Sequence, residues 1–297
     1  MSNLLTPAAQ RVAAQGLCAQ QPGSQQSATL FFVHIFKAGG TTSRDMLRAY
    51  SEKCKLLFRQ AGHCGPLPMP GWICTERWID VFAVEPASRP ALTRTDVVAG
   101  HIAWGIHAYG PHKPVFITCL RRPLDIFISA RLYRNRNVLT TSSTSSQAVF
   151  AILKMGPFAG ESHAAAYLSG VNRYGHNADL AIAHLQSRFA VVGILEEYSK
   201  FIDLVQRLID PPARLGSFWR ELKVKPPSNP SPISTGTVMN TILKSQPNFM
   251  ATVNASLRDE WRVYEAATAV FRHQYAASVY GAASQYARTH NVTWMKG

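Results

Sequence analysis

The fold of this chain is decided by the segment Thr29-Leu-Phe-Phe-Val-His-Ile-Phe-Lys-Ala-Gly-Gly-Thr-Thr-Ser-Arg-Asp-Met-Leu47. It begins with an apolar run, Leu30 to Ile35, whose aromatic and β-branched residues are typical of a strand. Lys37 and the pair Gly39-Gly40 interrupt this run, and hydroxyl residues follow where a helix would begin. A strand, Gly-rich turn and helix in this order predict an anion site, because backbone N–H groups and the positive end of the helix dipole point to one spot.

The position of the lysine restricts the anion that this turn can bind. A Walker A loop places its lysine after the glycines, whereas here Lys37 precedes Gly39 and Gly40, so an ATP or GTP loop fits poorly. The order Lys-x-Gly-Gly-Thr-[ST] after an apolar strand instead resembles the 5′-phosphosulfate loop of sulfotransferases that use PAPS (3′-phosphoadenosine 5′-phosphosulfate). The structural alternative is a turn in which the glycines only allow a tight reversal of the chain.

A second motif follows the unbroken apolar run Val115 to Leu120, which is typical of a buried parallel strand. Arg121 stands at the carboxyl end of that strand, Pro123 suits the first turn of a helix, and Ser129 lies two turns further along. The pattern Leu-Arg-x-Pro-x-x-x-x-x-Ser resembles the 3′-phosphate motif of the same enzymes. The resemblance implies that Arg121 and Ser129 hold the phosphate that distinguishes PAPS from ATP, and a guanidinium with a hydroxyl suits such a dianion. The alternative is an arginine that satisfies the end of a strand or helix.

A third motif contains a histidine. The residues before Gly100 predict a short strand, which places His101 just past its carboxyl edge, where ligands lie in open α/β sheets. Gly-His followed by a short apolar segment and Gly resembles the histidine motif of the 2-O-sulfotransferase-like carbohydrate enzymes. This resemblance implies that His101 is the general base, since an imidazole near neutrality accepts a hydroxyl proton. A lone histidine at such a place is otherwise a structural residue.

The resemblance to this family runs from about residue 28 to about residue 274 and assigns roles to the loop. Lys37 is expected to reach the bridging oxygen of the donor as a second catalytic residue. The residues expected to bind the 5′-phosphosulfate are Lys37, Ala38, Gly39, Gly40, Thr41 and Thr42. PAPS is then the sulfuryl donor and PAP the product. No metal is expected, because no Asp/Glu cluster lies near the loop.

Two positions depart from the family pattern. Phe36 stands where proline usually precedes the loop lysine, so it either loosens the turn or borders a hydrophobic acceptor. Arg122 stands where an acidic residue is common, which predicts the loss of an internal salt bridge and an extra positive charge facing the site.

The bulk composition predicts a large folded domain. The chain has 297 residues, 46% of them hydrophobic and 16% charged, which is enough to bury a sizeable core. We expect an α/β fold, a P-loop-like three-layer sandwich with a central parallel sheet flanked by helices. The expected organisation is a mobile N-terminal leader over residues 1–27 and a single sulfotransferase domain over 28–297. The Pro/Ser-rich stretch over 223–237 predicts a long loop, and such loops in compact chains tend to be functional or disordered. The family resemblance implies that this loop is a lid over the nucleotide.

The charge of the chain bears on the acceptor. The formal net charge of +14 predicts anionic ligands. His107, Arg131 and Arg134 flank the predicted cleft and are the candidate acceptor contacts. They favour an anionic, hydroxyl-bearing glycan, and an acidic peptide that presents tyrosine is the alternative. A basic nucleotide- or nucleic-acid-binding protein without transferase activity is the alternative of another class. A specific nucleic-acid partner is not expected, because only the helix from Arg131 to Arg136 interleaves arginines with an aromatic residue.

The cellular location of the protein is predicted from the targeting and membrane-spanning sequences that it does not show. The first 27 residues do not form a convincing signal peptide. No run of about 18 apolar residues occurs, so no membrane-spanning helix is expected. The five cysteines include no C-x-x-C pair, and most are expected to be reduced thiols, with one disulfide among Cys54, Cys64 and Cys74 left open. The prediction is a cytoplasmic protein, with its oligomeric state open.

Overall fold

The core of the structure is a parallel β-sheet. The computed structural model describes residues 6–19, 28–63, 72–75, 88–92, 95–109, 113–135, 144–154, 164–171, 177–211, 214–224 and 235–289. Within them, six strands form one sheet in the order β3-β2-β4-β1-β5-β6, and all neighbouring strands are parallel. The strands are β1 (Ala28–His34), β2 (Phe58–His63), β3 (Trp72–Thr75), β4 (Val97–Gly100), β5 (Lys113–Leu120) and β6 (Phe189–Ile194).

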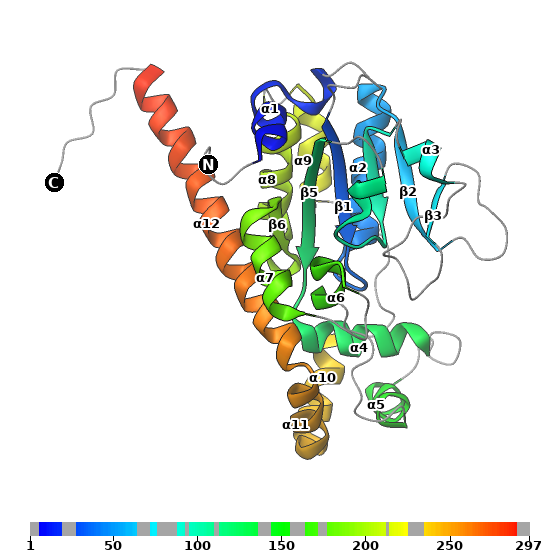
Figure 1. Cartoon of the computed structure of the whole chain (residues 1–297). Helices are drawn as coiled ribbons and strands as arrows, with labels where there is room; N and C mark the ends of the chain where they lie inside the picture. Colours follow the sequence, from blue (N-terminus) through cyan, green and yellow to red (C-terminus); the bar gives the residue numbers. More distant parts are fainter. Residues whose placement is uncertain are drawn as a thin grey trace.

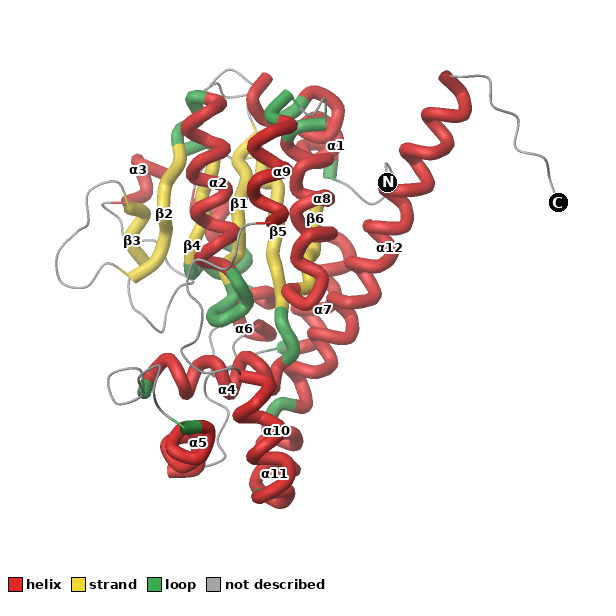
Figure 2. The backbone as a smooth tube through the Cα atoms, turned by 180° about the vertical axis from the view of Figure 1, so that it is seen from behind, coloured by secondary structure: helices red, strands yellow, loops and turns green. Residues whose placement is uncertain are grey.

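Helices cover the two faces of this sheet. The α-helices are α1 (Pro7–Gln15), α2 (Gly40–Cys54), α3 (Arg89–Leu92), α4 (Pro123–Arg134), α5 (Ser145–Lys154), α6 (Ala164–Ser169), α7 (Ala178–Ser187), α8 (Tyr198–Ile209), α9 (Gly216–Val224), α10 (Thr235–Ser245), α11 (Pro247–Ser256) and α12 (Arg258–Thr289). Helix α7 lies in front of the sheet in Figure 1, and the reverse view of Figure 2 shows α2, α8 and α9 in front of the opposite face. The predicted α/β fold, with a central parallel sheet between helical layers, is therefore confirmed.

Strand β1 runs through the middle of the sheet and sets the position of the site. All of its residues are buried, as its apolar sequence predicts. Its register pairs Val33 with Gly100 of β4 and His34 with Cys119 of β5. The three strands therefore end together, and the residues that follow them share the carboxyl edge of the sheet. Helix α4 crosses below this edge in Figure 1.

The expected mobile leader is wrong for residues 6–19. Helix α1 begins at Pro7, and the preceding Thr6 caps it: the Thr6 hydroxyl accepts a hydrogen bond from Ala9 N at 3.3 Å. Ala9 and Val12 are 0% exposed and, with Leu17, belong to the main hydrophobic core. The helix contains too few apolar residues to stand out in the sequence, and its stability comes from packing against the sheet and α8. Residues 1–5 and 20–27 lie outside the described residues.

The cysteine pairing also differs from expectation. Cys18 and Cys54 form a disulfide with their Cα atoms 5.0 Å apart, and Cys74 is disulfide-bonded as well. Cys119 is a free, buried thiol. The expectation that most cysteines are reduced is therefore wrong, because the packing of α1 brings Cys18 beside the end of α2. Structural disulfides are typical of oxidising compartments, so the pairing does not support the predicted cytoplasmic location.

Three further expectations concern the short strand β2, the predicted lid and membrane-spanning helices. Strand β2 was not expected, because its short sequence lacks a clear apolar alternation and it is held by pairing with β3 and β4. Most of the predicted lid, residues 225–234, lies outside the described residues. Among the residues that are described, no helix is both long and apolar enough to cross a bilayer.

Candidate functional site

The turn between β1 and α2 has an unusual backbone. Lys37 has φ 60° and Gly39 has φ 74°, both in the left-handed region. This conformation costs a non-glycine residue roughly 1–2 kcal/mol, and such strain often occurs at functional sites. Ala38 N donates to Ile35 O at 3.2 Å, which closes the turn. Helix α2 then begins at Gly40, and no side chain caps its first turn. The partly exposed Thr41 and Thr42 follow directly, as the sequence predicts.

Neighbouring side chains explain why both glycines are needed. A Cβ at Gly39 would lie 2.5 Å from Cδ1 of Leu195, and a Cβ at Gly40 would lie 1.7 Å from Cδ2 of His34. The turn is also held from the side of α8. Ser43 Oγ donates to Gly39 O at 3.4 Å and lies 3.2 Å from the hydroxyl of Tyr198. The loop is therefore packed tightly against the sheet, and its backbone conformation is fixed by contacts from β1 and β6–α8.

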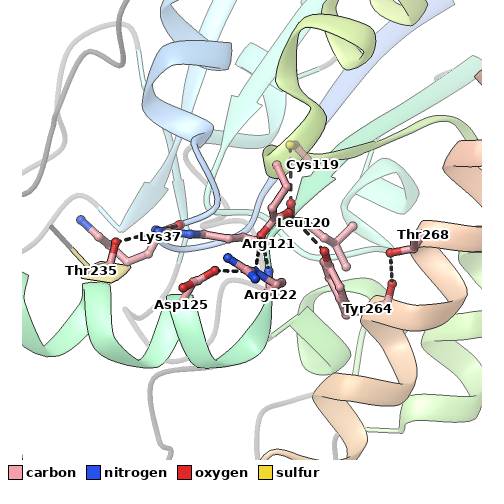
Figure 3. Close-up of polar contacts among 10 residues, drawn as sticks. Lys37, Cys119, Leu120, Arg121, Arg122, Asp125, Thr235, Tyr264 and Thr268 are labelled. Carbon is pink, nitrogen blue, oxygen red and sulfur yellow. Dashed lines mark hydrogen bonds and ion pairs between the residues drawn. The ribbon is translucent and has the colours of Figure 1, made fainter. Parts of the chain in front are cut away.

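Arg121 joins the two predicted phosphate motifs. Its Nη1 donates to the carbonyl oxygen of Lys37 at 3.3 Å, and its Nη2 donates to Oγ1 of Thr235, the first residue of α10, at 3.1 Å (Figure 3). Partial burial lowers the pKa of the Arg121 guanidinium from its usual value, an effect that Asp125 and Glu196 oppose. The guanidinium of the second motif thus touches the backbone of the first.

The neighbouring Arg122 has a different role from the one expected. Its Nε forms an ion pair with Asp125 at 2.7 Å and lies 3.4 Å from Oε1 of Glu196. Its backbone N–H also donates to Glu196 at 3.0 Å, and the hydroxyl of Tyr264 on α12 donates to the other oxygen of that carboxylate at 3.2 Å. The predicted loss of an internal salt bridge is therefore wrong. Arg122 instead links α4 to the end of β6 and to α12.

His101 lies against β1, just past the end of β4. Its Nδ1 lies 3.0 Å from the carbonyl oxygen of His34, and the two imidazole rings stack with centroids 4.1 Å apart. Burial lowers the pKa of His101 to about 4, with a smaller contribution from the positive charge of Arg44, while the His34 carbonyl opposes the shift. At neutral pH the ring is uncharged and has a lone pair available to accept a proton.

Aromatic rings surround the amine of Lys37. Its Nζ lies 4.5 Å from the ring centre of Tyr133 on α4 and 5.9 Å from that of Phe36, distances typical of cation–π contacts. The Phe36 ring is 6.1 Å from Tyr133 and 6.0 Å from His101. Phe36 is therefore packed between the two predicted catalytic side chains and is not a loose replacement for proline.

Ser129 lies in the helix that begins two residues after Arg121. It is 2% exposed and lies among the buried residues of α4. Arg121 donates a hydrogen bond to Lys37 O. Among the described residues, Ser129 makes no hydrogen bond to either of them. The phosphate-binding role of Ser129 stays a prediction.

The three predicted acceptor residues do not form one cluster. Arg131 is 1% exposed, and its Nη1 donates to Ile152 O of α5 at 2.9 Å. Its guanidinium lies 4.0 Å from the ring centre of Phe127, so this arginine holds α4 against α5. His107 packs its ring against Trp104 and Phe116, with centroid distances of 5.1 and 5.2 Å. These contacts favour structural roles for Arg131 and His107. Arg134, in the last turn of α4, is exposed.

Four side chains near the site were not singled out from the sequence: His34, Tyr133, Glu196 and Thr235. His34 is the last residue of β1, and Tyr133 lies near the end of α4. Their positions beside His101 and Lys37 depend on strand register and on the path of α4, which local sequence does not specify.

No protein-family model matches the chain, and no curated protein matches it. The family resemblance therefore depends on the motifs and on the geometry described above.

Proposed function

We propose that this protein is a PAPS-dependent sulfotransferase, related to the 2-O-sulfotransferase-like carbohydrate enzymes, that transfers a sulfuryl group to a glycan hydroxyl. The observation that carries the proposal is the 3.3 Å contact between Arg121 Nη1 and the carbonyl oxygen of Lys37. Two motifs that are 84 residues apart in sequence meet at one edge of the sheet. Each motif by itself is suited to an anion, and together they suit a nucleotide with phosphates at both ends.

The turn and the start of α2 fit the 5′-phosphosulfate. The first turn of α2 has no side-chain cap and no acidic residue, so its N–H groups and dipole are suited to an anion. Gly39 and Gly40 let the turn pack against Leu195 and His34, which supports a fixed position for these N–H groups. Thr41 and Thr42 add hydroxyl donors. Arg121, with Thr235 beside it, would hold the 3′-phosphate, and Ser129 of the same motif is the further contact that the sequence predicts.

The chemistry is a displacement at sulfur. PAPS supplies a sulfuryl group on a phosphate that is already a good leaving group. His101 takes the proton of the acceptor hydroxyl as the acceptor oxygen forms its bond to sulfur. The bond from sulfur to the phosphate oxygen breaks, and Lys37 stabilises the negative charge that remains on that oxygen. Lys37 must leave the face of Tyr133 to do this, which a phosphate favours because it pairs with an ammonium more strongly than an aromatic ring does.

The acceptor is proposed from charge and from the rings beside His101. The net charge of +14 favours an anionic glycan, and Arg134 is the exposed candidate contact among the three basic residues. Phe36 and Tyr133 add apolar surface next to the base, on which the ring of a sugar or a tyrosine would pack. A peptidyl-tyrosine acceptor is therefore the second candidate.

Calorimetric titration with PAP and with ADP tests the class of ligand. The proposal expects PAP to bind at least about 10-fold more tightly, because only PAP has the 3′-phosphate that a charged hydrogen bond to Arg121 would recognise. Equal affinities, or salt-sensitive binding of nucleic acid without PAP binding, would support the basic nucleic-acid-binding alternative instead. Incubation with labelled PAPS and a panel of glycans and acidic peptides then identifies the acceptor.

A further inference from the structure

The side chain of His34 contacts both the phosphate loop and His101. His34 ends β1 and is 5% exposed. Its ring fills the space at Gly40, where a Cβ would lie 1.7 Å from Cδ2 and 2.1 Å from Nε2. The same ring stacks on His101, with an interplanar angle of 23°. One planar side chain therefore sets the spacing between the first residue of α2 and the imidazole of His101.

The backbone of His34 makes the hydrogen bond that orients His101. The carbonyl oxygen of His34 lies 3.0 Å from Nδ1 of His101. A carbonyl oxygen can only accept, so a neutral His101 must carry its proton on Nδ1 to make this bond. Its Nε2 then has the lone pair. Of the two ring nitrogens, only Nε2 is left to accept a proton from an acceptor.

We propose that His34 is the positioning residue for the base: its carbonyl fixes His101 as the Nδ1–H tautomer, and its ring holds the imidazole at a set distance from the phosphate loop. This inference rests on the proposed function, in which Nε2 of His101 accepts the proton of the acceptor hydroxyl. His34 itself touches neither the donor nor the acceptor in this scheme and exchanges no proton with them.

The groups around the pair keep both rings neutral. Burial lowers the pKa of His34 well below its usual value, and His101, Arg44 of α2 and Lys37 lower it further. On the side of α6, Tyr167 presents its ring to His101 at 6.4 Å, and burial raises the pKa of its phenol, so it adds no charge. Since neither imidazole is protonated at neutral pH, the two rings stack without like-charge repulsion.

Nuclear magnetic resonance of the wild-type protein tests the tautomer directly. Long-range ¹H–¹⁵N correlations distinguish a protonated from an unprotonated ring nitrogen, and a His101→Ala variant identifies the signals of His101. We expect a neutral ring with the proton on Nδ1 at pH 7. A proton on Nε2 would overturn the inference. This measurement needs no donor or acceptor, so its result is independent of whether the protein transfers sulfuryl groups.

Two substitutions test the role of the ring. His34→Ala keeps the carbonyl but removes the stack, and we expect kcat to fall about 10²-fold through misplacement of the base. PAP affinity should change little. The acid limb of kcat/KM should move from near pH 4 upward, toward 6.5, because water would reach His101 and raise its pKa. His34→Phe restores a flat ring and should recover most of the rate.

The same variants can overturn the proposal. Thermal unfolding and PAP binding establish that each variant is folded. A folded His34→Ala protein with a wild-type kcat and an unmoved acid limb would show that the ring does not position His101. A folded His34→Phe protein with a rate as low as that of His34→Ala would show that the imidazole itself takes part in proton transfer.

Discussion

The two ends of helix α4 differ in how closely the structure agrees with the sequence predictions for their residues. At its amino end, Arg121 follows β5 and contacts the Lys37 turn. In its last turn, Arg131 was expected to bind an acceptor but donates to Ile152 inside the protein. Residues that directly follow parallel strands share one edge of the sheet, because the ladder fixes where strands end. The direction of a side chain within a helix depends on which helices pack around it.

The largest expected effect concerns the base. His101→Ala should lower kcat by about 10²–10⁴-fold, the range typical of a lost general base, while PAP affinity stays near that of the wild type. Steady-state kinetics with labelled PAPS and calorimetry with PAP measure the two quantities. His107→Ala is the matched control, since this ring packs on Trp104 and Phe116 away from the turn, and its rate should be close to the wild-type rate. A parallel loss of PAP affinity in His101→Ala would make His101 a binding residue.

Lys37→Ala should lower kcat by about 10²–10³-fold, because a positive group no longer stabilises the charge on the leaving phosphate. The fold should be retained, as measured by circular dichroism and thermal unfolding, since the amine lies on the ring faces of Phe36 and Tyr133 and the side chain is partly exposed. Turnover of Lys37→Ala close to that of the wild type would refute the assigned role.

Arg121→Ala should weaken PAP binding by about 10- to 150-fold, equivalent to the loss of a hydrogen bond to a charged group, and leave ADP binding nearly unchanged. Titration of both nucleotides measures this selectivity. Arg122→Ala is the adjacent control. Because Arg122 pairs with Asp125 and Glu196, its loss should lower the melting temperature without changing the preference for PAP. If both variants lose the preference equally, the two arginines do not have the separate roles described.

Arg131→Met has the smallest expected effect on activity. It removes the hydrogen bond to Ile152 O but keeps a long side chain against Phe127, and should destabilise the fold by about 1–3 kcal/mol. Chemical denaturation measures this change, and the KM for the acceptor should not move. A raised acceptor KM in a protein of wild-type stability would show that Arg131 binds the acceptor. The two ends of α4 would then not differ in the way described.

The sequence predictions are correct where a segment carries its own apolar pattern and wrong where the packing of helices decides. The strand from Leu30 to Ile35, the strand from Val115 to Leu120 and the helices after them were predicted because each is an apolar run followed by helical spacing and a suitable first-turn residue. Helix α1 was missed because it contributes only a few apolar residues and is stable only when packed. The disulfide from Cys18 to Cys54 was missed for the same reason, since it requires α1 to be in place.

The sequence by itself determined the parallel α/β sheet and the two motifs that we propose bind opposite ends of a nucleotide, because strand hydrophobicity, glycine and residue order are local properties. Only the tertiary structure decided that Arg121 touches the Lys37 turn, that His34 stacks on His101 and that Arg131 is buried. These contacts join residues distant in sequence, and they depend on strand register and helix packing, which are set by the whole core at once.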